Sequence, residues 1–120
     1  MRNIFLFSGV VCIFITSCCS YRKAQKEASP EEFKDLQEYE KALDKMERQL
    51  YQSLQVEPDC QRICQLKGNI CKLTQKICSL SKRHPGNPNI LLKCNDATKR
   101  CQRAEEKVTQ KCDCEQSNNL

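Results

Sequence analysis

Apolar residues recur at helical spacing in successive stretches of the chain, separated by segments rich in proline, glycine and asparagine. In residues 30–54 they lie three, four or seven positions apart while Lys and Glu fill the other faces, as in an amphipathic helix. Ser29, Pro30 and Glu32 favour a helix start, because serine caps, proline suits the first helical position and glutamate completes a capping box. The predicted stripe comprises Phe33, Leu36, Leu43, Met46, Leu50 and Leu54.

A seven-residue repeat follows in residues 63–83, where Ile-Cys-x-Leu occurs in every repeat. Seven residues make two helical turns, so Ile and Leu form an apolar stripe with the cysteines in a file along its flank. Residues 83–89 are dense in proline, glycine and asparagine and predict a turn. A last helix is expected over residues 89–111, with a narrow stripe of Leu91, Cys94, Ala97, Cys101, Ala104 and Val108.

The composition favours an all-α fold. The 120 residues include 11 cysteines, three glycines and no tryptophan. The chain also has long runs rich in Lys, Glu, Gln and Leu, which favour helices. A chain of this length has a core that ordinarily needs covalent staples. We therefore predict a helical hairpin cross-linked by disulfides, with an additional long N-terminal amphipathic helix in a three-helix arrangement.

The cysteine positions support the hairpin. In two antiparallel helices, residues at the same level share a common midpoint along the chain. Position 86, inside the turn predicted from proline and glycine alone, is the midpoint of three cysteine pairs. These pairs are Cys78 with Cys94, Cys71 with Cys101, and Cys60 with Cys112. We predict that the first two form disulfide rungs between the helices.

At the open end of the hairpin, the pairing has two solutions. Strict register joins Cys60 to Cys112 but leaves Cys64 with Cys114, which are poorly centred; nesting Cys64–Cys112 inside Cys60–Cys114 spreads the misfit, and we favour it. Disulfides require Cα atoms about 5.5–6 Å apart, closer than ordinary helix axes at about 8–10 Å. The small residues expected to permit this approach are Ala97, Ala104 and Gly68.

The first residues read as a secretory leader, with a basic start, an apolar stretch over residues 4–15 and then small residues. The stretch reaches only roughly 18 Å, too short for a hydrocarbon core of ~30 Å. Ile15-Thr16-Ser17-Cys18 resembles the bacterial lipobox, which implies that Cys18 becomes the acylated mature N-terminus. Cys19 is the alternative, but it would put a cysteine where the family has Gly, Ala or Ser.

The charge changes sign along the chain. Residues 27–57 hold nine acidic and four basic side chains, a net −5, whereas residues 58–120 hold six acidic and twelve basic, a net +6. The first helix is expected to lie along the hairpin, or alternatively to pair with another protein. The predicted organisation is a signal peptide (1–17), a lipidated N-terminus and tether (18–29), an amphipathic helix (30–55), a cysteine-rich hairpin (59–114) and a polar tail (115–120).

Cysteines four and seven apart on helices also resemble copper-storage bundles, in which reduced thiols bind Cu(I). The single histidine, His84, lies in the predicted turn, and the pairing across the hairpin favours disulfides instead. The sequence has no Cys-x-x-Cys pair and no Gly-x-Ser-x-Gly turn. We therefore expect no catalytic residue, metal ligand, cofactor or small-molecule substrate. The net charge of +5 includes no long basic run, so nucleic acid is not an expected partner.

The stretch over residues 59–114, with its Ile-Cys-x-Leu heptads and Cys-Asp-Cys ending, looks like uncharacterised cysteine-rich lipoproteins of Gram-negative bacteria. The resemblance implies a location and an architecture but no activity. The absence of aspartate after Cys18 implies the outer membrane, facing the periplasm. The predicted function is a non-enzymatic cell-envelope lipoprotein, held to the membrane by its N-terminal lipid, with a structural role or a protein partner in the envelope; the alternative is a periplasmic Cu(I)-binding protein.

Overall fold

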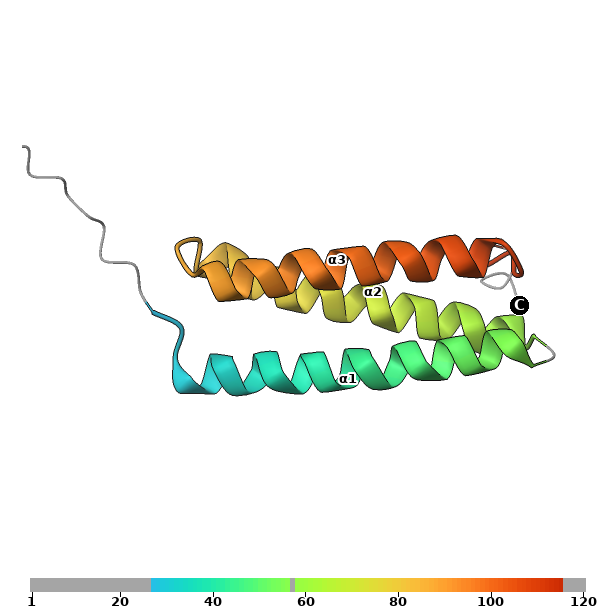
Figure 1. The fold of residues 1–120 in the computed structure, drawn as a ribbon, viewed down its shortest axis with the longest axis horizontal. Coiled ribbons are helices and arrows are strands. Elements are labelled where there is room, and N and C mark those ends of the chain that lie inside the picture. The colour runs from blue at the N-terminus through green and yellow to red at the C-terminus, as the bar shows by residue number, and fades with distance from the viewer. Residues whose placement is uncertain (1–26, 57, 116–120) are drawn as a thin grey trace, which may run out of the picture.

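The computed structural model describes residues 27–56 and 58–115, and within these ranges it contains the helices α1 (Pro30–Gln55), α2 (Cys60–Arg83) and α3 (Pro88–Thr109) and no strand (Figure 1). The predicted all-α class is confirmed. The predicted leader, the lipidation site Cys18 and most of the polar tail lie outside the described residues. No helix in the described part is both long and apolar enough to cross a membrane.

The start of α1 has the predicted capping box. The Ser29 hydroxyl accepts a hydrogen bond from the backbone N–H of Glu32 at 3.2 Å, and the Glu32 carboxylate accepts one from the backbone N–H of Ser29 at 2.9 Å. At the start of α2, the Asp59 carboxylate accepts from the backbone N–H of Arg62 at 3.2 Å. Both caps satisfy backbone donors that have no partner within the helix.

The third helix begins one residue before the predicted start and ends two before the predicted end. The side chain of Asn87 accepts hydrogen bonds from the backbone N–H groups of Asn89 and Ile90, and Pro88 occupies the first helical position. Asparagine followed by proline is a recognisable helix start, although these residues were predicted only as part of a turn.

Each helix runs antiparallel to the one before it, so α1 and α3 point in the same direction (Figure 1). The most extensive contact is between α2 and α3. The helix α1 packs chiefly on α2 and has a smaller contact with α3. The prediction that the first helix lies along the hairpin is therefore confirmed. The start of α1 and the α2–α3 turn share one end of the bundle, which we call the closed end (Figure 1).

Each helix contributes a line of buried side chains to one core. The isoleucine of every α2 heptad is buried, as are the four leucines of the predicted α1 stripe. Hydrophobic burial along these lines supplies the non-covalent part of the stability. The core comprises Leu36, Leu43, Leu50, Leu54, Ile63, Leu66, Ile70, Ile77, Leu80, Ile90, Ala97, Ala104 and Val108, with Ala28 and Cys112 at its ends.

Three predictions about packing are wrong. Leu91 is 47% exposed, because Ile90 lies seven residues before Ala97 and therefore two turns along the same buried line. Phe33 is 40% exposed; with buried Ala28 it occupies the two positions of a hydrophobic staple at the start of α1. A side chain added at Gly68 would meet open space, so this glycine does not permit a close approach.

Candidate functional site

Within the described residues, four disulfides form a ladder between α2 and the chain from α3 onward. Their Cα–Cα distances lie between 4.7 and 5.5 Å. Ala97 and Ala104 are buried and leave room for this approach, as expected. Both predicted rungs are present. The bonds are Cys78–Cys94, Cys71–Cys101, Cys60–Cys112 and Cys64–Cys114.

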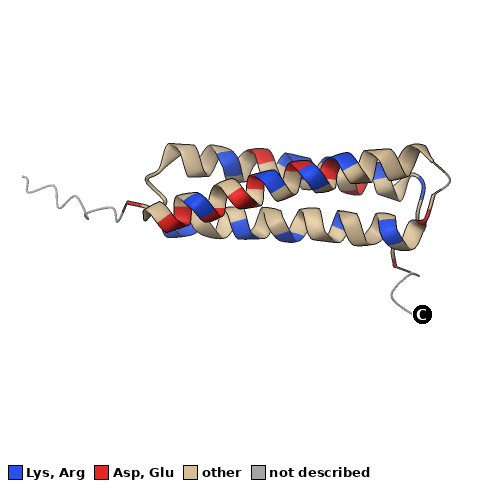
Figure 2. Ribbon diagram, turned by 90° about the horizontal axis from the view of Figure 1, so that it is seen from below, with Lys and Arg blue, Asp and Glu red and all other residues tan. Residues whose placement is uncertain are grey.

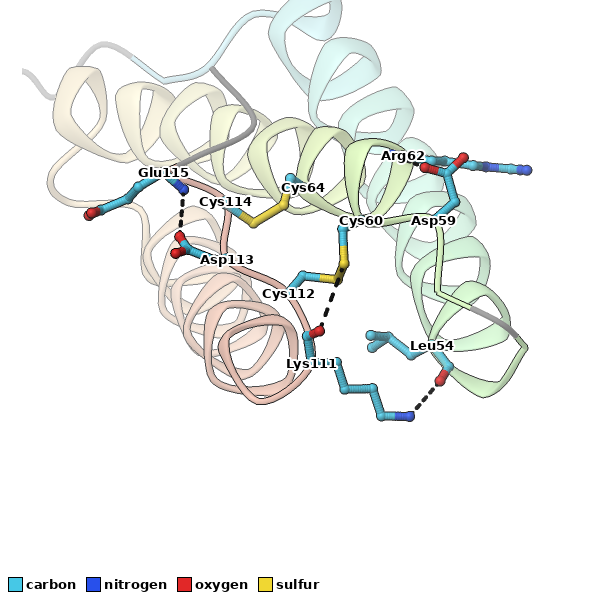
Figure 3. The surroundings of a disulfide bond; sticks show 10 residues. All are labelled: Leu54, Asp59, Cys60, Arg62, Cys64, Lys111, Cys112, Asp113, Cys114 and Glu115. Carbon is cyan, nitrogen blue, oxygen red and sulfur yellow. Dashed lines mark hydrogen bonds between the residues drawn. A yellow bond between two sulfur atoms is a disulfide. The ribbon is translucent and has the colours of Figure 1, made fainter. Parts of the chain in front are cut away.

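The nested pairing at the open end is wrong, because the last two cysteines are not helical. After α3 ends at Thr109, the backbone N–H groups of Lys111 and Cys112 both donate to the carbonyl of Val108, at 3.0 and 2.8 Å. The chain therefore turns back, and Cys114 reaches Cys64, one turn further into α2 than Cys60 (Figure 3). The observed pairing is the strict-register alternative: Cys60–Cys112 keeps the common midpoint, and Cys64–Cys114 departs from it because the chain is no longer helical there.

A buried hydroxyl joins the same two helices between the inner rungs. The Thr74 hydroxyl lies 3.0 Å from the carbonyl oxygen of Ala97 on α3 and 3.1 Å from that of Ile70 on its own helix. Thr74 and Ser81 occupy the same heptad position and are both buried. The burial of this position was not predicted from the sequence.

Disulfide bonding leaves these eight cysteines without thiol groups to bind Cu(I). Among the described residues, one group brings potential metal ligands within 4.8 Å of one another, and it consists of Cys71, Cys101 and Glu105. Both sulfurs of this group belong to a disulfide. The pairing therefore argues against the copper-binding alternative, which requires reduced cysteines.

His84 ends α2 at the closed end and is buried. Its backbone N–H donates to the carbonyls of Leu80 and Ser81, and its Nε2 lies 3.0 Å from the Glu32 carboxylate. Arg83 Nη1 lies 3.3 Å from the other oxygen of that carboxylate. The backbone hydrogen bond from Ser29, the hydrogen bond with His84 and the electrostatic effects of His84 and Arg83 hold the pKa of Glu32 below its ordinary value. One carboxylate thus joins the capping box of α1 to the end of α2.

A row of ion pairs connects α1 to α3. Arg100 is 13% exposed, and its Nε donates to the Glu47 carboxylate at 2.7 Å while Nη2 contacts Asp44. Burial alone would lower the pKa of Arg100, but the hydrogen bonds that it donates to these carboxylates, together with their negative charge, outweigh burial and raise it. Nearer the closed end, Lys93 Nζ lies 2.6 Å from Glu40, and that hydrogen bond raises the pKa of Lys93. These pairs bear out the complementary charges noted in the sequence.

Half-buried tyrosines on either side of the leucine line hold further cations. Lys76 Nζ of α2 lies 5.4 Å from the ring centre of Tyr39, and Lys107 Nζ of α3 lies 5.0 Å from that of Tyr51. Neither tyrosine belongs to the apolar stripe predicted from the sequence. Cation–π pairs at partly exposed sites contribute about 0.5–1 kcal/mol each, so they help to set how α1 sits against α2 and α3.

Comparison of the chain with known protein families, with curated proteins and with solved structures finds no match. The fold and the site define the protein by its architecture, as an all-α bundle whose hairpin is locked by a disulfide ladder. The resemblance to cysteine-rich lipoproteins stays a prediction.

Proposed function

We propose that this chain is a non-enzymatic lipoprotein of the bacterial cell envelope, anchored through an acylated Cys18, whose helical domain has a structural role or presents its surface to an envelope protein. The observation that carries the proposal is the complete pairing of the eight cysteines from residue 60 onward. Disulfides persist in oxidising compartments such as the periplasm, and a secretory leader would deliver the chain there.

The proposed tether between the lipid anchor and the first helix is short. Eleven residues separate Cys18 from Pro30, where α1 begins, and a chain of that length spans at most about 40 Å. Two or three acyl chains would make the attachment lasting. The outer membrane, facing the periplasm, is the proposed location because Cys19 rather than aspartate follows Cys18.

Mass spectrometry of the purified, unreduced protein tests the anchor and the bridges together. We expect an intact mass that begins at Cys18 and includes diacylglycerol and fatty acid, together with the four cross-linked peptides and no free thiol among the eight cysteines. Eight reactive thiols would overturn the disulfide proposal in favour of Cu(I) binding.

The adjacent cysteines provide a matched pair of variants. Cys18→Ser should abolish acylation and leave the leader uncleaved, whereas Cys19→Ser should leave both reactions unchanged. An intact, unacylated mass for the wild-type protein, or acylation that is lost only with Cys19→Ser, would overturn the assignment of the anchor to Cys18.

A further inference from the structure

The helix α2 differs from its neighbours in charge. Its residues Cys60–Arg83 include six Lys and Arg and no Asp or Glu, whereas α1 has four basic and seven acidic residues and α3 has five basic and three acidic. Figure 2 shows α2 as the helix with blue bands alone, while red and blue alternate along α1. The helix α2 is therefore the only one of the three described helices that carries cations and no carboxylate.

The carboxylates of α1 pair with more cations of α3 than of α2. Lys93, Arg100 and Arg103 of α3 all form ion pairs with α1. Of the α2 cations, only Arg83 forms an ion pair with a carboxylate in the described part of the chain, and Lys76 lies over the ring of Tyr39. The remaining α2 cations, which pair with no carboxylate of the described residues, are Arg62, Lys67, Lys72 and Lys82.

Four exposed cations lie in the second half of α2. Lys72, Lys76 and Arg83 follow one another at intervals of four and seven residues, which places them along one line of the helix. Lys82 lies about 100° around the helix from Arg83, at the edge of this line. All four are exposed. We call these residues the cationic face. The exposed residues between them include the neutral Gln75 and Ser79, so no carboxylate of α2 interrupts the face.

We infer that the cationic face docks on the anionic phospholipid headgroups of the bilayer that holds the N-terminal lipid, which lays α2 along the membrane surface. This inference rests on the proposed lipid anchor. Lys82 and Arg83 end α2 at the closed end, where α1 also begins (Figure 1). The eleven residues between Cys18 and Pro30 therefore connect the proposed anchor to this end of the bundle. Because this tether spans at most about 40 Å, the bilayer is the polyanionic surface kept within reach. Each Lys or Arg near such a surface strengthens attachment by about fivefold at low salt.

Lysine footprinting of the full chain reconstituted in vesicles tests the docking, because the native lysines serve as probes and no cysteine is added. Lys72 and Lys82 should be acetylated several-fold more slowly in vesicles containing phosphatidylglycerol than in vesicles of phosphatidylcholine alone, and high salt should remove the protection. Lys34 and Lys45, exposed on α1, are the internal control and should react equally in both. Equal rates for Lys72 and Lys82 in the two vesicles would overturn the inference. Protection seen only in intact envelopes would also overturn it and point to an acidic protein.

Charge-neutral variants separate this face from net charge. The double change Lys72→Gln and Lys82→Gln should abolish most of the protection of Lys76, whereas Lys34→Gln and Lys45→Gln, with the same loss of charge, should leave it unchanged. Equal effects of the two variants would contradict docking through α2. The intact mass of the same preparation reports the anchor separately: an acylated protein without protection refutes the docking alone, and protection without acylation refutes the anchor alone.

Discussion

The hairpin of α2 and α3 and the first helix α1 are held by different means. Four covalent bonds set the register of the hairpin, whereas α1 depends on four buried leucines, two tyrosine–lysine contacts and a row of ion pairs. Covalent links restrict the unfolded chain, while burial and ion pairs stabilise only the folded one. The comparison implies that α1 is the part of the domain that responds to mutation, pH and salt.

Reduction of the disulfides should have the largest effect on this contrast. The disulfide that closes the shortest loop joins residues with a sequence separation of 16. Closing a loop of that size alone contributes about 3 kcal/mol, a large fraction of a small domain's stability. We expect the fully reduced protein to lose most of its helical circular dichroism at room temperature. The oxidised protein in the same buffer is the control. Unchanged helix content, with eight thiols shown to be free, would contradict this prediction.

Leu50→Ala should detach α1 and leave the hairpin cross-linked. Leu50 is fully buried, and removing its side chain is expected to cost about 2–5 kcal/mol through lost burial and a residual cavity. Thermal unfolding should shift to lower temperature, and hydrogen exchange should accelerate most in α1. Leu91→Ala is the matched control, since Leu91 is exposed, and it should change stability by less than about 0.5 kcal/mol. Similar losses in the two variants would place the core elsewhere.

Arg100→Ala tests the ion-pair row between α1 and α3. Loss of the guanidinium leaves Glu47, which is largely shielded from solvent, without its closest cation, and we expect a cost of about 2 kcal/mol. Lys99→Ala, which removes an exposed cation one residue away, should have a much smaller effect. Denaturant unfolding measures both. If Lys99→Ala proved as damaging as Arg100→Ala, net charge rather than this contact would be responsible.

The smallest expected effect concerns pH at the closed end. Because the pKa of Glu32 is lower in the folded protein than in the unfolded chain, the folded state binds fewer protons at this carboxyl. Its stabilisation is therefore present above the ordinary glutamate pKa and is lost as pH falls through the lowered folded value. Glu32→Gln preserves a capping-box side chain but removes the charge facing Arg83 and His84. As pH falls through this acidic range, the unfolding temperature should decrease less steeply in the variant than in the wild type. Parallel curves of unfolding temperature against pH would refute this role of Glu32.

Local patterns predicted most of the helices because their causes are local. The serine cap, the Ile-Cys-x-Leu heptads and the prolines at 30, 58 and 88 act within a few residues. The buried face of α3 was harder to predict. Ile90 and Leu91 are adjacent and equally apolar, and only contact with α2 determines which of them is buried. For the same reason the repeat did not distinguish buried Thr74 and Ser81 from exposed polar residues.

The sequence by itself determined the helical class, the hairpin and its two inner rungs, because a regular helix converts spacing along the chain into position in space. The tertiary structure alone decided the remaining pairings, since Cys112 and Cys114 follow the end of α3, where spacing no longer determines position. It also decided where α1 lies. Both the hairpin and another protein could have covered its leucines, and the match of Glu40, Asp44 and Glu47 to the cations of α3 became apparent only with the helices side by side.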